Sequence, residues 1–152
     1  MHRDTDRPPS PPLHSVSVAG AIIRTDGRML VIKRRDNGTW EPPGGILELD
    51  ETPQAGVVRE VLEETGIHVE VEQLTGVYKN MTQGVVALVF RCEPTGGIEF
   101  PTSESVAVEW ITCEQVSDRM SEAYAIRMLD ALNSNTPAVR CHDGSRLIAF
   151  EW

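Results

Sequence analysis

The first part of the chain alternates between apolar runs, which predict strands, and polar segments, which predict turns. Val16, Val18 and the apolar run 21–23 predict one strand, Thr-Asp-Gly at 25–27 predicts a turn, and residues 29–33 predict a second strand. A polar loop is expected over 34–39. Two prolines and two glycines within 40–45 predict irregular backbone, and residues 46–49 predict a short strand.

A helix is predicted over 53–65, because Thr52 suits the N-cap, Pro53 suits the first helical position and Gly66 suits the end. A helical wheel divides its residues into two arcs. The first arc contains Ala55, Val57, Val58, Val61, Leu62 and Thr65, and the second contains Gly56, Arg59, Glu60, Glu63 and Glu64. We therefore expect the first arc to pack against the core and the second to present its carboxylates on the opposite side.

The rest of the chain predicts more strands than helices. Strands are expected over 67–71 and 85–92, the latter central in its sheet because it is almost continuously apolar, and a turn at Gly96-Gly97 precedes another strand over 106–111. A helix beginning near residue 114 or 118 should end at 132, and residues 138–150 predict a hairpin around 142–144. The pattern predicts one mixed α/β (α+β) domain over 15–152, in which 137–152 form a hairpin extension. Residues 1–14, with four prolines, predict a flexible arm.

The 152 residues carry a net charge of −9, and nearly all of the excess lies in one stretch. Residues 41–72 contain nine acids and one base, whereas the other 120 residues contain 14 acids and 13 bases. This balance excludes a basic surface for long nucleic acid or for an anionic membrane. No apolar run is long enough to span a membrane, and the N-terminus lacks the apolar core of a signal peptide. Three widely spaced cysteines without a C-x-x-C pair predict a reducing, cytoplasmic environment.

The predicted helix 53–65 concentrates three acids in its C-terminal half. Glu60 lies three and four residues before Glu63 and Glu64, and like charges at those spacings destabilise a helix by a few tenths of a kcal/mol each. The helix dipole also disfavours anions at that end. Two interpretations remain open from these residues: a solvated polar face, or a set of ligands for a divalent cation. Mg²⁺ and Mn²⁺ prefer carboxylate oxygens combined with substrate phosphates.

The spacing of residues 45–67 is far more specific than the acidic cluster alone. The pattern begins at Gly45, continues after five residues with Glu51, and ends after seven more with Arg-Glu-Val-Leu-Glu-Glu-Thr-Gly-Ile. Its seven specified residues arise by chance with a probability on the order of 10⁻⁸ per position. This pattern is similar to the signature box of the Nudix hydrolase superfamily, without a departure. The resemblance extends from about Val16 to Leu132, and in layout it is closest to small MutT-like nucleoside-triphosphate pyrophosphohydrolases.

The resemblance implies an α/β/α sandwich around a mixed sheet, and hydrolysis of a nucleoside diphosphate linked to a further group X by water attack at phosphorus. It implies Glu60, Glu63, Glu64 and the backbone carbonyl of Gly44 as ligands for Mg²⁺, with Mn²⁺ as an alternative. Glu60 is also the implied general base, and Arg59 and Glu51 would orient the carboxylates. Glu104 matches a position where some relatives supply a further carboxylate for metal or base. Its alternative is an exposed loop acid.

The substrate is less constrained by the sequence. Arg35 matches a position that contacts nucleotide in some relatives, and its alternative is a solvated loop arginine. Trp40 and Tyr78 are candidates for stacking on a base, although the tryptophan before Pro-Pro-Gly-Gly also suits packing of that turn. The ADP-ribose subgroup usually carries a proline about fifteen residues after the box. Thr82 stands there, which disfavours ADP-ribose.

We therefore expect a metal-dependent pyrophosphohydrolase, with a (d)NTP as substrate and the monophosphate and pyrophosphate as products. A different class remains open, a nucleotide-binding sensor with the same fold and no turnover. Nudix hydrolysis of ADP-ribose, nucleotide sugars or capped RNA ends is a further alternative. The expected partner is a small nucleotide rather than long nucleic acid or membrane, with a homodimer as a further hypothesis. The other five acids of the stretch, Glu41, Glu48, Asp50, Glu70 and Glu72, are expected on the solvated surface.

Overall fold

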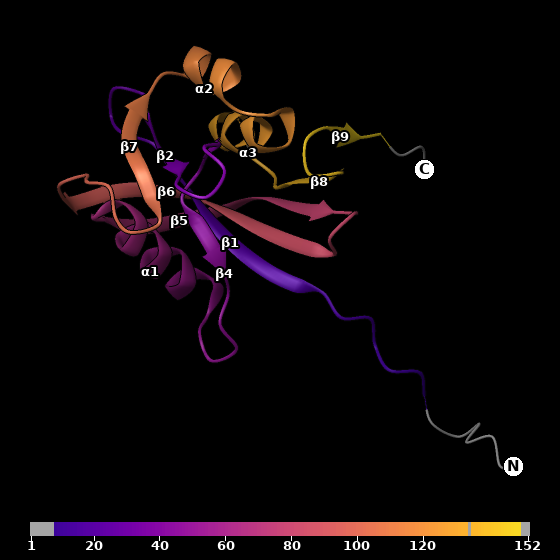
Figure 1. The fold of residues 1–152 in the computed structure, drawn as a ribbon. Coiled ribbons are helices and arrows are strands. Elements are labelled where there is room, and N and C mark those ends of the chain that lie inside the picture. Colours follow the sequence, from indigo (N-terminus) through magenta and orange to yellow (C-terminus); the bar gives the residue numbers. More distant parts are fainter. Residues whose placement is uncertain (1–7, 134, 150–152) are drawn as a thin grey trace, which may run out of the picture.

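The protein folds around two β-sheets with helices on both sides (Figure 1). The structure is a computed structural model, and it describes residues 8–133 and 135–149. The elements are β1 (Ser15–Ile22), β2 (Met29–Arg34), β3 (Trp40–Glu41), β4 (Gly44–Ile46), α1 (Pro53–Thr65), β5 (Ile67–Asn80), β6 (Val85–Gly97), β7 (Ser105–Ile111), α2 (Cys113–Arg119), α3 (Glu122–Asn133), β8 (Ala138–His142) and β9 (Leu147–Ile148). The main sheet has the order β4-β1-β6-β5-β8-β9, and the smaller sheet has the order β3-β2-β7.

Alternation along β1 separates two cores, one on each face of the main sheet. Val18 and Ile22 pack with Val57 and Val61 of α1, whereas Ala19 and Ala21 belong to the cluster that contains residues of α3. Helices α1 and α3 therefore cover opposite faces (Figure 1). Strand β6 runs parallel to β1 and antiparallel to β5, which confirms its expected central place and makes the sheet mixed. The predicted α/β/α sandwich is confirmed.

The segment before α1 differs from its prediction. Residues 40–45 were expected to be irregular, yet they contain β3, which pairs with β2, and most of β4, which pairs with β1. The two prolines, at 42 and 43, lie between these strands, where no ladder hydrogen bond is lost. The segment thus crosses from the small sheet to the main sheet. The expected strand over 46–49 is wrong beyond Ile46, and β4 begins earlier, at the two glycines.

Several other elements have different bounds from those predicted. β6 continues beyond the expected end at 92 to Gly97, so the turn expected at Gly96-Gly97 is wrong, because both glycines pair with β5. β5 continues to Asn80, because bulges in its ladder allow the polar stretch after Val71 to stay paired with β6. The single helix expected before residue 132 is two helices, because Thr112 caps α2 in a capping box and the backbone at Met120 is extended. The hairpin forms from β8 and β9, and β8 pairs with β5. The last position of the expected hairpin, 150, lies outside the described residues. The expected arm is described only over residues 8–14, which are exposed coil, and its residues 1–7 lie outside the described part.

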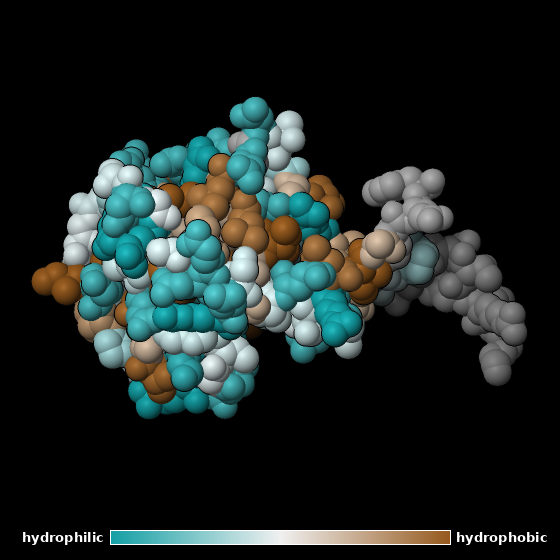
Figure 2. Space-filling view, turned by 90° about the horizontal axis from the view of Figure 1, so that it is seen from above, coloured by the Kyte–Doolittle hydropathy of each residue, from teal (hydrophilic) through white to brown (hydrophobic). Residues whose placement is uncertain are grey.

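The surface seen from the side of α2 and α3 is largely polar, with apolar side chains gathered in a few areas (Figure 2). Across the described residues, no helix combines the length and the apolar character needed to cross a bilayer.

Candidate active site

Helix α1 has the predicted bounds, and its local chemistry explains them. The Thr52 hydroxyl accepts a hydrogen bond from the Ala55 N–H at 3.2 Å. At the other end, Gly66 takes a left-handed conformation (φ 79°) that any other residue would adopt only with strain, and its N–H donates to the carbonyl of Leu62. The carboxylates of α1 therefore occupy a helix whose ends are set by sequence.

The two faces of α1 differ from the helical-wheel prediction. The row 57-61-65 is buried as expected, but Ala55, Val58 and Leu62 are exposed. The adjacent row, Gly56, Glu60 and Glu64, is buried instead. The reason is tertiary, because β4 and the loop after it cover this second row. The acids of that row therefore do not lie on a solvated face.

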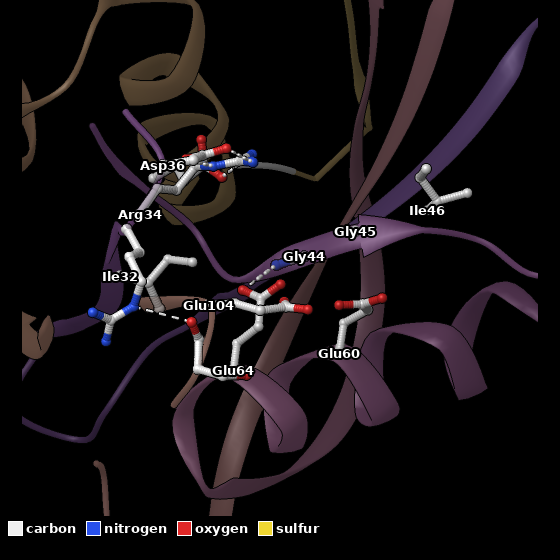
Figure 3. Close-up of a pocket in the computed structure, with 12 residues that line it drawn as sticks. Ile32, Arg34, Asp36, Gly44, Gly45, Ile46, Glu60, Glu64 and Glu104 are labelled. Atoms are coloured by element: carbon white, nitrogen blue, oxygen red, sulfur yellow. Dashed lines mark hydrogen bonds and ion pairs between the residues drawn. The ribbon is translucent and has the colours of Figure 1, made fainter. Parts of the chain in front are cut away.

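Gly44 and Gly45 lie directly above Glu60 and Glu64 (Figure 3). The Gly44 N–H donates to Oε2 of Glu64 at 3.3 Å. A Cβ on Gly45 would lie 2.6 Å from Cδ of Glu60, so only glycine leaves room for this carboxylate. Beside them opens a cavity of about 790 Å³, lined by Ile32, Arg34, Arg35, Asp36, Glu41, Gly44, Gly45, Ile46, Glu60, Glu64, Ser103 and Glu104. Its volume is in the range of small-molecule sites.

Glu60 and Glu64 form a buried acidic pair at the wall of this cavity. Their exposed fractions are 9% and 4%. Burial, followed by the contact with the Glu60 carboxyl, raises the pKa of Glu64 to about 9. Glu104 contributes in the same direction through its charge, and the hydrogen bond from Gly44 opposes the shift. Two carboxylates in this position are stable together only when a proton or a cation neutralises part of their charge.

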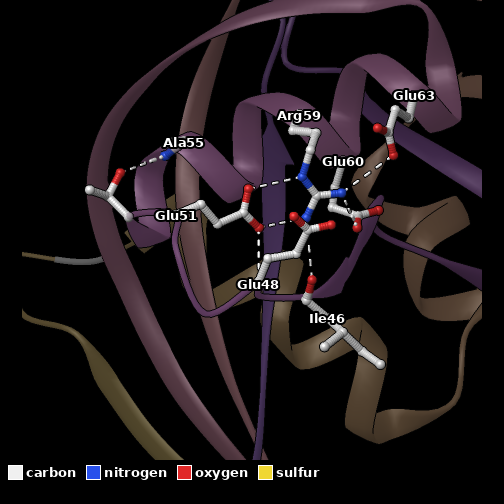
Figure 4. A network of polar contacts seen from close by, with 8 residues as sticks. Ile46, Glu48, Glu51, Ala55, Arg59, Glu60 and Glu63 are labelled. Carbon is white, nitrogen blue, oxygen red and sulfur yellow. Dashed lines mark hydrogen bonds and ion pairs between the residues drawn. The ribbon is translucent and has the colours of Figure 1, made fainter.

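Arg59 is the cation at the centre of a network of polar contacts that includes Glu60 (Figure 4). Its guanidinium donates twice to Glu51, at 2.6 and 2.9 Å, and once to Oε1 of Glu60 at 2.8 Å. It also donates to the carbonyl of Ile46 and, at 3.4 Å, to Glu63. Arg59 thereby connects Glu60 to the loop after β4, which fits the predicted orienting role of Arg59 and Glu51.

Replacement of Glu51 by glutamine should remove stability that depends on pH. Two hydrogen bonds from Arg59, followed by the N–H of Glu48, lower the pKa of Glu51 from 4.5 to about 2. A depressed carboxyl pKa stabilises the fold above the unfolded pKa, and this contribution is lost as the pH falls towards the folded pKa. We expect Glu51→Gln to lower the Tm at pH 7, with a difference that shrinks from about pH 4.5 to 2. Calorimetric melts across this range measure it.

Glu70→Gln, the same change at an exposed residue, is the control for that series. A Tm difference for Glu51→Gln that stays constant down to pH 2 would contradict a role for its ionised carboxylate.

The predicted ligand set of Gly44, Glu60, Glu63 and Glu64 divides into two parts. Gly44, Glu60 and Glu64 line the cavity, whereas the side chain of Glu63 is 61% exposed and contacts Arg59. Among the described residues, no three Asp, Glu, His or Cys side chains converge as they would around a metal ion. A buried pair of carboxylates nevertheless fits Mg²⁺, which keeps several waters and uses one or two carboxylates together with substrate phosphates.

Arg35, directly after β2, and Glu104, in the loop before β7, both reach the same cavity. The Arg35 side chain donates to the carbonyls of Ser103, at 3.0 Å, and Ser105, at 3.4 Å. Its backbone N–H donates to the carbonyl of Glu104. Arg35 therefore holds the loop that carries Glu104 at the cavity.

The two aromatic candidates do not line this cavity. Tyr78 is fully buried, and its hydroxyl donates to Asp130 at 2.8 Å. The prediction that Tyr78 stacks on a base is wrong, because the strand extended to Asn80 turns the ring into the core beneath α3. Trp40 packs against the same core, and Arg119 lies 5.0 Å from its ring centroid. This packing agrees with the packing alternative, although Trp40 also lines a second cavity of about 460 Å³ that shares Arg34 and Glu41 with the main one.

Three charged residues of the cavity wall were not singled out from sequence. Arg34 donates to Asp36 at 2.6 Å and to Glu41 at 3.3 Å. Glu41 was expected on the solvated surface, and this expectation is wrong, because its side chain is only 12% exposed and pairs with Arg34. Burial raises the pKa of Glu41, and the charge of Arg34 opposes the shift. The position of Glu41 just before Pro-Pro-Gly-Gly was the only sequence signal for this role.

The fold and the carboxylates of α1 beneath two glycines are those of a Nudix hydrolase. A family model described as NUDIX domain matches residues 13–132, and the chain belongs to this family. A MutT-like protein from Streptomyces ambofaciens is 68% identical over 139 residues, covering 91% of this chain and 90% of the relative. An ADP-ribose pyrophosphatase from Methanocaldococcus jannaschii is 38% identical over 92 residues, 56% of this chain and 54% of that protein. The crystal structure of a MutT NUDIX hydrolase from Burkholderia pseudomallei superposes with a TM-score of 0.70 at 27% identity, covering 78% of this chain and 98% of that one.

Proposed function

We propose that this protein is a divalent-metal-dependent pyrophosphohydrolase that acts on a nucleoside triphosphate or its deoxy form. The products would be the monophosphate and pyrophosphate. The observation that carries this proposal is the buried Glu60–Glu64 pair beside Gly44, at the wall of a 790 Å³ cavity. Burial of two acids is costly for a fold unless a cation is part of the working site.

Glu60, Glu64 and the backbone carbonyl of Gly44 would hold Mg²⁺ or Mn²⁺, and Glu63 would join them by turning its exposed side chain. When bound, such a cation neutralises charge on the pyrophosphate and lowers the pKa of water. Glu60 accepts the proton of the attacking water, the new bond forms between water oxygen and phosphorus, and the bond from phosphorus to the bridging oxygen breaks. Arg59 keeps the Glu60 carboxylate in place. Glu104, which lines the same cavity, is the second candidate for the base.

A triphosphate is favoured over ADP-ribose by two observations. The relative that matches nearly the whole chain is named MutT-like, whereas this chain spans about half the length of the relative named ADP-ribose pyrophosphatase. Thr82 replaces the proline that marks the ADP-ribose subgroup, and it lies in a turn where its N–H donates to Asn80. A panel of NTPs, dNTPs, oxidised dNTPs, ADP-ribose, nucleotide sugars, dinucleoside polyphosphates and capped RNA, each assayed with Mg²⁺ and Mn²⁺, tests this choice.

The second candidate function is a nucleotide sensor without turnover. The paired contacts of Arg59 with Glu51 and Glu60 favour the enzyme, because simple binding does not require an oriented carboxylate. Tight nucleotide binding without hydrolysis of any member of the panel would replace the enzyme by the sensor. The three cysteines are free in the structure, which suits our proposal of a cytoplasmic protein. A homodimer remains our hypothesis, to be tested by light scattering.

Addition of Mg²⁺ should raise the Tm of the protein in the absence of nucleotide. The cation would relieve the repulsion within the buried pair, and a ligand at 100 times its Kd stabilises a fold by about 2.7 kcal/mol. We expect an increase of a few degrees, measured by thermal melts with Mg²⁺ and with EDTA. Glu64→Gln should abolish the increase, and Glu70→Gln should keep it. An equal Mg²⁺ effect in both variants would place the cation elsewhere.

A further inference from the structure

A smaller cavity of about 190 Å³ adjoins the main one on the side of the main sheet that α3 covers. The two cavities share Arg34, Glu41, Gly44, Gly45 and Ile46, so β3 and β4 form their common wall. The small cavity is completed by β1 and by Tyr124 and Arg127 of α3. A molecule with its phosphates near Glu60 and Glu64 could extend its other end into this space.

Arg127 is the unusual residue of the small cavity. It is only 8% exposed, and its guanidinium stacks on two rings, 4.8 Å from the centroid of Tyr124 and 5.3 Å from that of Tyr78. Burial lowers its pKa, and Tyr124, Tyr78 and Glu41 oppose this shift. Within the described residues, its Nε is the single buried side-chain N or O atom that lacks a hydrogen-bond partner. Such buried donors almost always have an acceptor, because leaving one unpaired is costly.

The contact of Arg127 with His142 does not provide the missing acceptor for Nε. Nη2 of Arg127 lies 3.2 Å from Nε2 of the imidazole, while the N–H of Gly144 points at Nδ1 from 3.0 Å. Burial, together with the charge of Arg127, lowers the pKa of His142, so the ring is neutral. A neutral imidazole accepts at only one nitrogen. The imidazole therefore accepts from only one of these two donors, and it offers nothing to Nε.

A hydrogen-bond acceptor, the carboxylate of Glu41, also lines the small cavity. The Glu41 carboxylate accepts from Arg34, and its charge interacts with that of Arg127, although the described contacts contain no hydrogen bond between Glu41 and Arg127. The small cavity thus presents an unpaired donor, from Arg127, and a carboxylate acceptor, from Glu41. A neutral group with a carbonyl oxygen next to an N–H would complement both.

We propose that Arg127 and Glu41 read the base of the nucleotide, with Arg127 donating to a ring carbonyl and Glu41 accepting from the adjacent ring N–H. This inference rests on the proposed nucleotide substrate. Guanine, hypoxanthine, uracil and thymine carry this pair of groups. Adenine and cytosine carry the reverse pair, an amino donor beside an unprotonated ring nitrogen, and would place donor against donor and acceptor against acceptor. Sites with buried hydrogen-bonding groups reject such mismatched ligands strongly.

IMP and AMP are the sharpest probes, because their bases differ only in this pair of groups and because a monophosphate has no pyrophosphate bond to hydrolyse. Isothermal titration with Mg²⁺ present should give a Kd for IMP at least about tenfold lower than that for AMP. Arg127→Met should bring the ratio to about one by weakening IMP. The variant should stay folded, as its Tm checks, because methionine is an apolar side chain of similar length. Arg127→Lys, which keeps a charge but loses the planar fork, should lose most of the preference.

Arg119→Met is the matched control. Arg119 also stacks on an aromatic ring, that of Trp40, but it lines the 460 Å³ cavity and not the small one. Its IMP-to-AMP ratio should equal that of the wild type. Equal affinities in the wild type, or a preference that survives in Arg127→Met, would overturn the proposal. Arg127-dependent binding of inorganic phosphate would also overturn it, since the small cavity would then be an anion site.

The titration separates this inference from the proposed function. A base preference that depends on Arg127, in a protein that hydrolyses no triphosphate, would support base reading and reject the enzyme. Hydrolysis of triphosphates without a preference for IMP would support the enzyme and reject base reading.

Discussion

Glu60→Gln should lower kcat by at least ~10²-fold while the fold remains intact. The carboxylate of Glu60 is 9% exposed, lines the 790 Å³ cavity and is held by Arg59 at 2.8 Å. Glutamine has nearly the same shape but accepts no proton at neutral pH and binds a divalent cation poorly. The loss should appear in steady-state hydrolysis of the best substrate of the panel, while far-UV circular dichroism remains unchanged.

The same substitution at two other acids provides the comparison. Glu70→Gln, on the exposed side of β5, should leave kcat unchanged. Glu63→Gln shows whether its exposed carboxylate joins the cation: a loss close to that of Glu60→Gln would make Glu63 a ligand, and near-normal activity would restrict the set to Glu60, Glu64 and Gly44. Near-normal activity of Glu60→Gln itself would remove Glu60 from both of its proposed roles.

Gly45→Ala should cost activity without an equivalent cost in stability. The added Cβ would lie 2.6 Å from Cδ of Glu60 and 2.6 to 2.7 Å from both carboxylate oxygens. These atoms are the end of a flexible side chain, so the carboxylate can move aside at little cost to the fold. A displacement of about 1 Å in a catalytic group can reduce turnover on the order of 10²-fold. Kinetics together with thermal melts measure both effects.

Gly96→Ala is the control, because a Cβ at Gly96 would meet no atom within 4 Å. It should change neither activity nor Tm. If Gly45→Ala kept normal turnover, the close approach of β4 to Glu60 would have no role in holding the carboxylate. If its Tm fell sharply, the glycine would be required mainly for packing.

Helix α1 shows how far local sequence information extends. Its N-cap, first proline and final glycine were predictable, because each satisfies backbone groups only a few residues away. The burial of its faces was only half predictable. The row of Val57 follows from apolar periodicity, but the burial of Glu60 and Glu64 depends on a strand that pairs with β1, which no periodicity in α1 reveals.

The same limit applies to the aromatic and basic residues. Tyr78 has the composition of a stacking residue, and only the parallel pairing of β5 with β8 and the packing of α3 show that its ring lies in the core. Arg127 stands in an ordinary amphipathic helix. Its unpaired Nε emerges only when Tyr78, Tyr124 and His142, from three separate elements, surround the same guanidinium.

The sequence by itself determined the family, the candidate acids of the site and the helix that carries them, because box spacing and helix capping act over a few residues along the chain. Only the tertiary structure decided which of those acids face the cavity. It buried Glu60 and Glu64 beneath Gly44 and Gly45 and left Glu63 outside with Arg59. The physical reason is that burial and the resulting pKa of Glu64 depend on sheet pairing between distant segments, and this pairing brings β4 across the helix.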